Sequence, residues 1–154
     1  MTAPRSGAPR TIAELSLPSE PGNESRASEE VARAMSELGL PQRTLERLKT
    51  AVAEATKNAM EHGNRYDPEV PVKIQVWLLE ERLLVRIIDR GGSPPPSPNA
   101  QMPDLEAKLE GRQTPRGWGL FLIKNMVDEL RVSGNPDHHT VELVIHLKGE
   151  DDAG

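Results

Sequence analysis

The chain of 154 residues contains no cysteine, only four aromatic residues and no long apolar run. The lack of cysteine excludes disulfide frameworks, thiolate zinc sites and thiol nucleophiles. No apolar run approaches the roughly 18 residues that a membrane-spanning helix needs, and no apolar segment follows the N-terminal arginines. The sequence therefore predicts neither a membrane span nor a secretory signal, and we expect a cytoplasmic protein.

An excess of basic charge is also missing. The chain has 24 Asp and Glu against 19 Lys and Arg, and the two signs are interleaved, which gives a net charge of −5. Because a nucleic-acid backbone is bound by a basic patch, we expect no direct nucleic-acid binding. With 36% hydrophobic and 28% charged residues, the composition is typical of an ordinary folded domain and not of a disordered chain.

The prolines divide the chain. Of the 14 prolines, four lie in residues 1–21 and six in residues 94–115, which predicts two irregular segments. We expect a flexible leader over residues 1–10, a single folded domain over residues 11–148 and a flexible tail over residues 149–154. A chain of this size can bury roughly 70% of its unfolded surface, which is enough for a core.

The periodicity of apolar residues predicts the elements of this domain. Helical spacing predicts helices over residues 24–38, from residue 42 to a glycine cap at Gly63, and from about residue 117 to residue 130. Alternation predicts strands over residues 11–17, 72–79, 83–89, 131–133 and 140–148, with a turn at 134–137. This order predicts an α+β two-layer sandwich, in which the helices cover one face of a mixed, mostly antiparallel sheet.

Two polar side chains on the second helix are candidates for chemistry. Glu54 and Asn58 are four residues apart, so a carboxylate and a carboxamide point together from the border of the apolar stripe. An ordinary surface pair at this spacing is the simpler interpretation, and the spacing alone leaves both open.

Two glycine-containing segments are the next candidates. Asp89 ends a strand and is followed, after Arg90, by two glycines, which would let the backbone approach a ligand closely or would simply make a turn. Gly117 and Gly119 begin an amphipathic helix, whose free N–H groups suit an anion, although a loop hinge has the same sequence features.

The three segments occur in an order that resembles the GHKL ATPase superfamily. The sequence EATKNAMEHGN (residues 54–64) is similar to the N box of that superfamily, DRGG (89–92) to its first glycine box and GWGL (117–120) to its second. The resemblance covers about residues 11–148. The N box that closes with EHGN, the second glycine box that runs directly into LFLI and the single short domain are most similar to the anti-sigma-factor serine kinases.

This resemblance implies a role for each candidate residue. Asn58 would ligate Mg²⁺, and Glu54 would be the general base that accepts the proton of an attacking hydroxyl. The adenine of ATP would be held by Asp89, with Thr140 beside it on the sheet and Gly91 leaving space for the base. The phosphates would meet Arg116 and the backbone N–H groups of Gly117, Gly119 and Leu120.

The resemblance also implies an ATP lid over about residues 93–115 and a function. The first glycine box usually has another glycine two positions after Gly91, where this chain has Ser93 followed by three prolines, so a stiffer lid is expected. The implied function is a Mg²⁺- and ATP-dependent serine/threonine kinase and anti-sigma factor. It would phosphorylate a small antagonist protein, sequester a sigma factor and form a homodimer. The alternative is an ATP-binding module that binds partner proteins without phosphorylating them.

Two further residue types have simpler explanations. His138 and His139 precede the last predicted strand with no acid or cysteine cluster nearby, so we expect a surface pair and not a metal site. Trp118 is expected to pack in the core or against the lid.

Overall fold

The computed structural model describes residues 9–91, 115–135 and 137–147, without the side chains of residues 115–119 and 135. The predicted tail, nearly all of the leader and nearly all of the lid lie outside these residues. The first half of the chain contains β1 (Arg10–Leu17), α1 (Asn23–Ala34), the 3₁₀ turn η1 (Ser36–Leu38), α2 (Gln42–Asn58) and the π-helical turn η2 (Ala59–Gly63). The second half contains β2 (Val72–Leu79), β3 (Arg82–Asp89), α4 (Pro115–Met126), β4 (Glu129–Asn135) and β5 (His138–His146).

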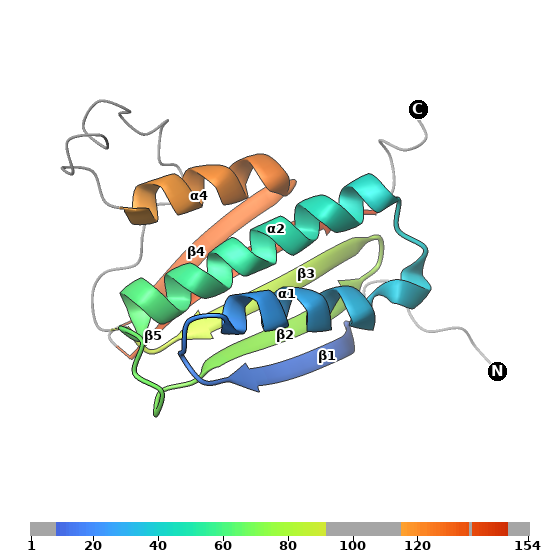
Figure 1. The fold of residues 1–154 in the computed structure, drawn as a ribbon. Coiled ribbons are helices and arrows are strands. Elements are labelled where there is room, and N and C mark those ends of the chain that lie inside the picture. Colours follow the sequence, from blue (N-terminus) through green and yellow to red (C-terminus); the bar gives the residue numbers. More distant parts are fainter. Residues whose placement is uncertain (1–8, 92–114, 136, 148–154) are drawn as a thin grey trace.

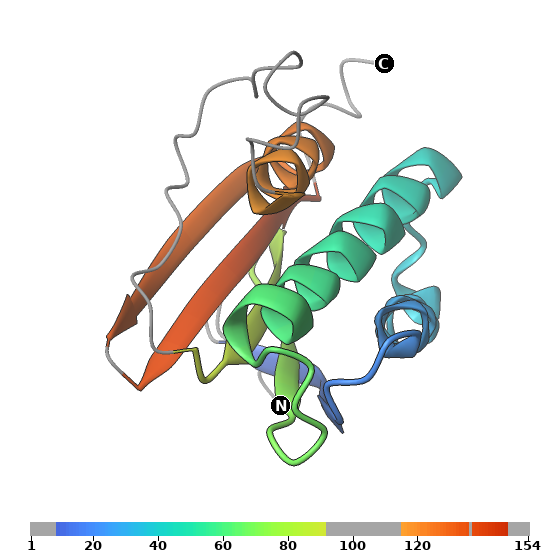
Figure 2. The same cartoon turned by 60° about the vertical axis from the view of Figure 1, so that its left-hand side comes forward.

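The five strands form one sheet in the order β1-β2-β3-β5-β4. All four neighbouring pairs are antiparallel, so the described sheet has no parallel pair. The three α-helices lie on one side of this sheet, and no described helix covers its other side (Figures 1 and 2). The predicted α+β two-layer sandwich is therefore confirmed, whereas its described sheet is antiparallel and not mixed.

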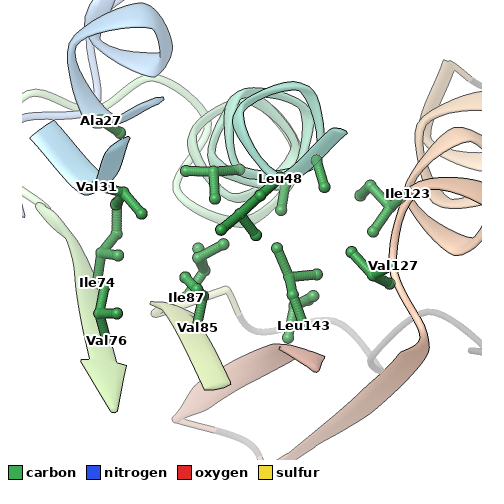
Figure 3. Packing of buried hydrophobic residues seen from close by; sticks show 14 of the residues in the cluster. Ala27, Val31, Leu48, Ile74, Val76, Val85, Ile87, Ile123, Val127 and Leu143 are labelled. Carbon is green, nitrogen blue, oxygen red and sulfur yellow. The ribbon is translucent and has the colours of Figure 1, made fainter. Parts of the chain in front are cut away.

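The core lies between the helices and the inner face of the sheet. Successive strand residues point to opposite faces, so every second side chain of each strand meets the helices. Figure 3 shows Ala27 and Val31 of α1 against Ile74 and Val76 of β2, Leu48 of α2 near Val85 and Ile87 of β3, and Ile123 and Val127 near Leu143 of β5. Every one of these side chains is buried, and burying a Val, Leu or Ile side chain stabilises the fold by roughly 1.5–3 kcal/mol.

The third helix is shorter than predicted. It ends at Met126, and Leu130 lies in β4, which runs from Glu129 and is longer than the predicted 131–133. Asp128 joins the chain to the sheet at this point, because its N–H donates to Val144 O (2.9 Å) and its Oδ2 accepts the N–H of His146 (2.6 Å). Apolar residues at 127 and 130 fit a helix and a strand equally well, so periodicity could not separate the two.

Two other boundaries also differ from the prediction. The first helix ends at Ala34, and a 3₁₀ turn continues to Leu38 before Gly39 adopts a left-handed φ of 68°. Strands β4 and β5 pair as far as Asn135 and His138. The connection between them is therefore shorter than the predicted turn over residues 134–137. Among the described residues, no helix is both long and apolar enough to cross a membrane.

Candidate functional site

Three motifs that are distant in the sequence meet where α2, β3 and α4 approach one another. Asn58 at the end of α2, Asp89 at the end of β3 and Leu120 of α4 line the same small hollow of about 10 Å³, which we call the central hollow. Its other lining residues are apolar: Ala55, Ala59, Ile123 and Val141. The tertiary fold therefore brings the three candidate segments to one place.

Asn58 is a buried amide with an unused donor. It is 7% exposed, and its Nδ2 has no hydrogen-bond partner among the described residues. An unpaired buried polar group costs about 1–3 kcal/mol, so its retention calls for an explanation in binding. The unpaired Nδ2 is a donor and cannot bind a cation, but the carboxamide oxygen of the same side chain is a hard ligand of the kind that Mg²⁺ takes.

Glu54 lies one helical turn before Asn58 at the rim of the helix bundle. Its side chain is partly exposed and makes no hydrogen bond or ion pair with any residue that the structure describes. Asn58 is buried, so the two residues do not form the surface pair that the spacing alone allowed. Glu54 is instead partly exposed to solvent.

Asp89 is 3% exposed and is enclosed by two glycines. Its Oδ1 accepts the N–H of Gly91 (2.7 Å), which is a turn of the kind that Asp favours. A Cβ at Gly63 would lie within 2.5 Å of both carboxylate oxygens, and a Cβ at Gly91 would lie 2.9 Å from the Cα of Gly63. Close backbone approach therefore requires glycine at both positions.

The predicted glycine cap at Gly63 is wrong. Gly63 does not have a positive φ and belongs to η2, the π-helical turn that extends α2 beyond Asn58. Such turns occur frequently at functional sites, because the wider turn shifts the backbone that follows it. Here η2 brings Gly63 against the carboxylate of Asp89, and this contact is what demands the glycine.

Asn64 is a buried residue whose importance the sequence reasoning missed. Its Nδ2 lies within hydrogen-bond distance of Ser19 Oγ (3.0 Å) and Val70 O (3.1 Å), and its Oδ1 accepts the N–H of Arg90 (2.8 Å). This one side chain therefore connects the segment after β1, the segment before β2 and the residue directly after Asp89. The only signal in the sequence is its place as the last residue of EHGN.

The two residues after Asn64 have an unusual backbone. Arg65 and Tyr66 both have a φ of 54°, in the left-handed region that residues with a side chain rarely adopt. Burial raises the pKa of Tyr66, and the carboxylates of Glu61 and Glu24 raise it further, so its phenol stays neutral at physiological pH.

His139, and not Thr140, lies beside Asp89. In the register of β3 and β5, Asp89 pairs with His139, and Ile88 pairs with Thr140. Thr140 therefore points to the outer face of the sheet, where it lines a larger hollow of about 680 Å³ together with residues such as Lys73. His139 is 1% exposed, with its Nδ1 3.4 Å from Asp89 Oδ1. The prediction of a surface pair is wrong for His139, whereas His138 is exposed.

The start of α4 supplies backbone groups near the same place. The helix begins at Pro115, so Gly117 and Gly119 lie near its N-terminus, and Leu120 is buried at the central hollow. The N-terminus of α4 and the C-terminal end of α2 lie at the same end of the molecule (Figure 1). Free N–H groups at a helix N-terminus suit an anion, which makes this end of α4 a candidate phosphate site. The side chains of Arg116 and Trp118 lie outside the described residues.

Known proteins resemble the chain in sequence. The chain is 30% identical over 148 residues to the serine-protein kinase RsbW of Bacillus subtilis, which covers 89% of this chain and 86% of that protein. It is 33% identical over 125 residues to the anti-sigma F factor of Bacillus cytotoxicus, which covers 81% of this chain and 82% of that protein.

Solved structures resemble the chain in fold. The RsbU and RsbW domains of a Mycobacterium tuberculosis protein match with a TM-score of 0.64 at 18% identity, over 91% of this chain and 32% of that longer chain. The SiaB–SiaC complex of Pseudomonas aeruginosa matches with a TM-score of 0.62 at 13% identity, over 88% of this chain and 90% of that chain. The profile of the histidine kinase-like ATPase domain matches residues 17–145, which is most of the sequence. The chain therefore belongs to the family of histidine kinase-like ATPase domains.

Proposed function

We propose that this protein is a Mg²⁺- and ATP-dependent serine/threonine protein kinase and anti-sigma factor. It phosphorylates a Ser or Thr of a small antagonist protein and sequesters a sigma factor. The observation that carries the proposal is the convergence of Asn58, Asp89 and Leu120 on the central hollow, with the carboxylate of Glu54 one helical turn away. The similar proteins that are named serine-protein kinase and anti-sigma F factor support the same function.

ATP binds with its base at Asp89. A carboxylate accepts hydrogen bonds only, so Asp89 receives the N–H of the adenine 6-amino group. The enclosure by Gly63 and Gly91 fixes the direction in which the carboxylate points. The central hollow of about 10 Å³ has room for no more than one water molecule, so its walls must move apart before the base can lie against the apolar side chains of Ala55, Ile123 and Val141.

The phosphates lie between α2 and the start of α4. The backbone N–H groups of Gly117, Gly119 and Leu120 and the side chain of Arg116 bind their oxygens, and residues of the lid over 93–115 cover them. The Oδ1 of Asn58 would hold Mg²⁺, which would neutralise charge on the phosphates.

Glu54 accepts the proton in the transfer step. The hydroxyl oxygen of the antagonist protein attacks the γ-phosphorus while its proton moves to the Glu54 carboxylate. The bond from the γ-phosphorus to the oxygen of the β-phosphate breaks, and ADP leaves with that electron pair. The products are a phosphorylated antagonist and ADP.

The deciding experiment separates binding from transfer. A fluorescent ATP analogue with Mg²⁺ measures binding, and transfer of the labelled γ-phosphate to a candidate antagonist measures the reaction. We expect Glu54→Gln to leave affinity within about threefold and to lower the transfer rate by 10²–10⁴-fold, the usual contribution of a general base. Glu46→Gln, on the same helix but two turns away, is the matched control and should change neither.

The other outcomes of this experiment are equally informative. Binding of ATP without transfer to any antagonist would favour the alternative, a module that binds partners without phosphorylating them. No ATP binding by the unaltered protein would contradict the proposed site.

The proposal includes the assembly and the partners. We propose a cytoplasmic homodimer that binds a sigma factor while the antagonist is phosphorylated and that makes no direct contact with nucleic acid. Light scattering on the purified protein measures whether it is a dimer. Titration calorimetry measures its affinity for the sigma factor, with phosphorylated or with unphosphorylated antagonist present. A monomer, or a sigma factor affinity that does not respond to the antagonist, would contradict these parts.

A further inference from the structure

A buried imidazole lies beside the carboxylate that the proposed function assigns to adenine. His139 is 1% exposed, and its Nδ1 is 3.4 Å from Asp89 Oδ1. Neither ring nitrogen has a hydrogen-bond partner among the described residues. A buried polar ring without partners is unfavourable, so this ring is expected to find one in the functional state.

The sheet holds this ring in place. Asp89 of β3 lies opposite His139 of β5, and His139 lies opposite Gly134 of β4, so the three residues form one row across three strands. A Cβ at Gly134 would lie 3.0 Å from Cδ2 of His139 and 2.8 Å from the carbonyl oxygen of His138. The glycine thus leaves the space that the ring occupies.

The gap between the two side chains is small. An N–H···O hydrogen bond has a donor–acceptor distance of about 2.7–3.2 Å, so a shift of a few tenths of an ångström would close the gap of 3.4 Å. A carboxylate offers about four acceptor positions, so Asp89 can accept from Gly91, from an imidazole N–H and from a ligand at the same time. A carboxylate that is held in this way keeps its orientation.

We infer that His139 is a positioning residue for adenine recognition, a role that rests on the proposed ATP site. In the nucleotide-bound protein, Nδ1–H of His139 donates to Oδ1 of Asp89 and holds the carboxylate as the acceptor for the 6-amino group. Guanine carries a carbonyl oxygen at that position, so two acceptors would face each other and guanine nucleotides are rejected. The row from Gly134 to Asp89 is therefore a device for base selection.

The test compares two nucleotides that differ in one group. Purine riboside triphosphate is ATP without the 6-amino group, and calorimetry without an antagonist measures the affinity of each. We expect His139→Leu to weaken ATP binding about tenfold and to leave binding of purine riboside triphosphate within twofold. His139→Asn should keep at least a third of the ATP affinity, because its amide can donate from nearly the position of Nδ1.

The outcomes separate positioning from simple structural support. An equal loss for both nucleotides, or no loss for either, would overturn the role of His139 while the ATP site stands. No nucleotide binding by the unaltered protein would overturn the proposed function and this inference with it.

A measurement on the unaltered protein avoids variants that fail to fold. The ¹⁵N chemical shifts of the His139 ring report which nitrogen carries a proton. We expect Nδ1 to be protonated, with its proton protected from exchange, when ATP is bound. An Nδ1 without a proton in the ATP complex would overturn the inference.

Discussion

The Oδ1 of Asn64 accepts a hydrogen bond from the backbone N–H of Arg90 at 2.8 Å. This bond joins the end of η2 to the residue directly after Asp89. On its other side, the amide of Asn64 lies within hydrogen-bond distance of Ser19 Oγ and Val70 O. The position of the Asp89 carboxylate therefore depends on a side chain that does not line the central hollow.

Replacement of Asn64 should be costly. Asn64→Ala leaves the buried N–H of Arg90 and the hydroxyl of Ser19 with fewer partners, so we expect the free energy of unfolding to fall by about 2–4 kcal/mol. Urea denaturation measures the change. Asn23→Ala is the matched control, because its amide makes one exposed bond to Pro18 O, and it should cost less than about 1 kcal/mol. Equal losses for the two variants would contradict this account of Asn64.

Replacement by alanine should be more costly at Gly63, which lies against Asp89, than at Gly39, which has open space around it. Gly63→Ala puts a Cβ into the carboxylate of Asp89, so we expect a loss of about 1–3 kcal/mol and ATP affinity reduced more than tenfold. Gly39→Ala meets open space and only strains a φ of 68°, so it should cost roughly 1 kcal/mol and leave affinity unchanged. Thermal unfolding and nucleotide titration on both variants check this prediction, and it fails if Gly63→Ala binds ATP normally.

Asn58 should show a conflict between stability and function. Asn58→Leu replaces a buried amide, whose Nδ2 lacks a partner among the described residues, by an apolar side chain of similar shape. We expect the unfolding free energy without nucleotide to rise by about 1 kcal/mol, because an unsatisfied donor is removed. The enhancement of ATP binding by Mg²⁺ should disappear. A variant that is destabilised by several kcal/mol would show instead that the amide is structural.

Glu129 should make stability depend on pH in the acid range. The hydrogen bond from Arg131 (2.8 Å) and the contact with His146 (3.0 Å) lower the pKa of Glu129 from its usual 4.5. A carboxylate with a lowered folded-state pKa stabilises the protein above its unfolded pKa, and this contribution is lost as the pH falls through the folded pKa. Glu129→Gln should thus be slightly less stable than the unaltered protein at pH 7.

The difference should vanish when the pH falls well below 4.5. Denaturant unfolding of both proteins at several pH values measures it. Glu37→Gln is the control, since Glu37 is exposed and contacts no cation in the described part of the chain. A difference between Glu129→Gln and the unaltered protein that stays constant down to acid pH would contradict the prediction.

Some elements were predictable because one local signal determined them. The hairpin of β2 and β3 has strict alternation on both sides of a charged turn, and its predicted strands agree with the structure within one residue. The start of α2 at Gln42 follows a proline and a glycine, which are strong local signals. The end of α4 was not predictable, because apolar residues at 127 and 130 fit the periodicity of a helix and that of a strand. Only the hydrogen bonds of Asp128 to β5 show that the helix has ended.

Part of the candidate site was likewise predictable from the sequence, and part was not. Its segments were found from residue type and order, and the structure brings Asn58, Asp89 and Leu120 to one hollow. The choice of Thr140 as the neighbour of Asp89 failed by one residue, because a strand places adjacent side chains on opposite faces and only the pairing register says which one faces inward. Asn64 was missed because its bonds reach residues as far as 45 positions away.

The sequence by itself determined the layered α+β architecture, because apolar periodicity and glycines are local properties of the chain, and the order of its motifs singled out the three candidate segments. Only the tertiary structure decided that Gly63 serves Asp89, that His139 is buried beside that carboxylate and that Asn64 links the surrounding segments. These relationships depend on strand register and on contacts between distant residues. Such contacts form when burial of the common core fixes the elements against one another, and no short window of sequence contains them.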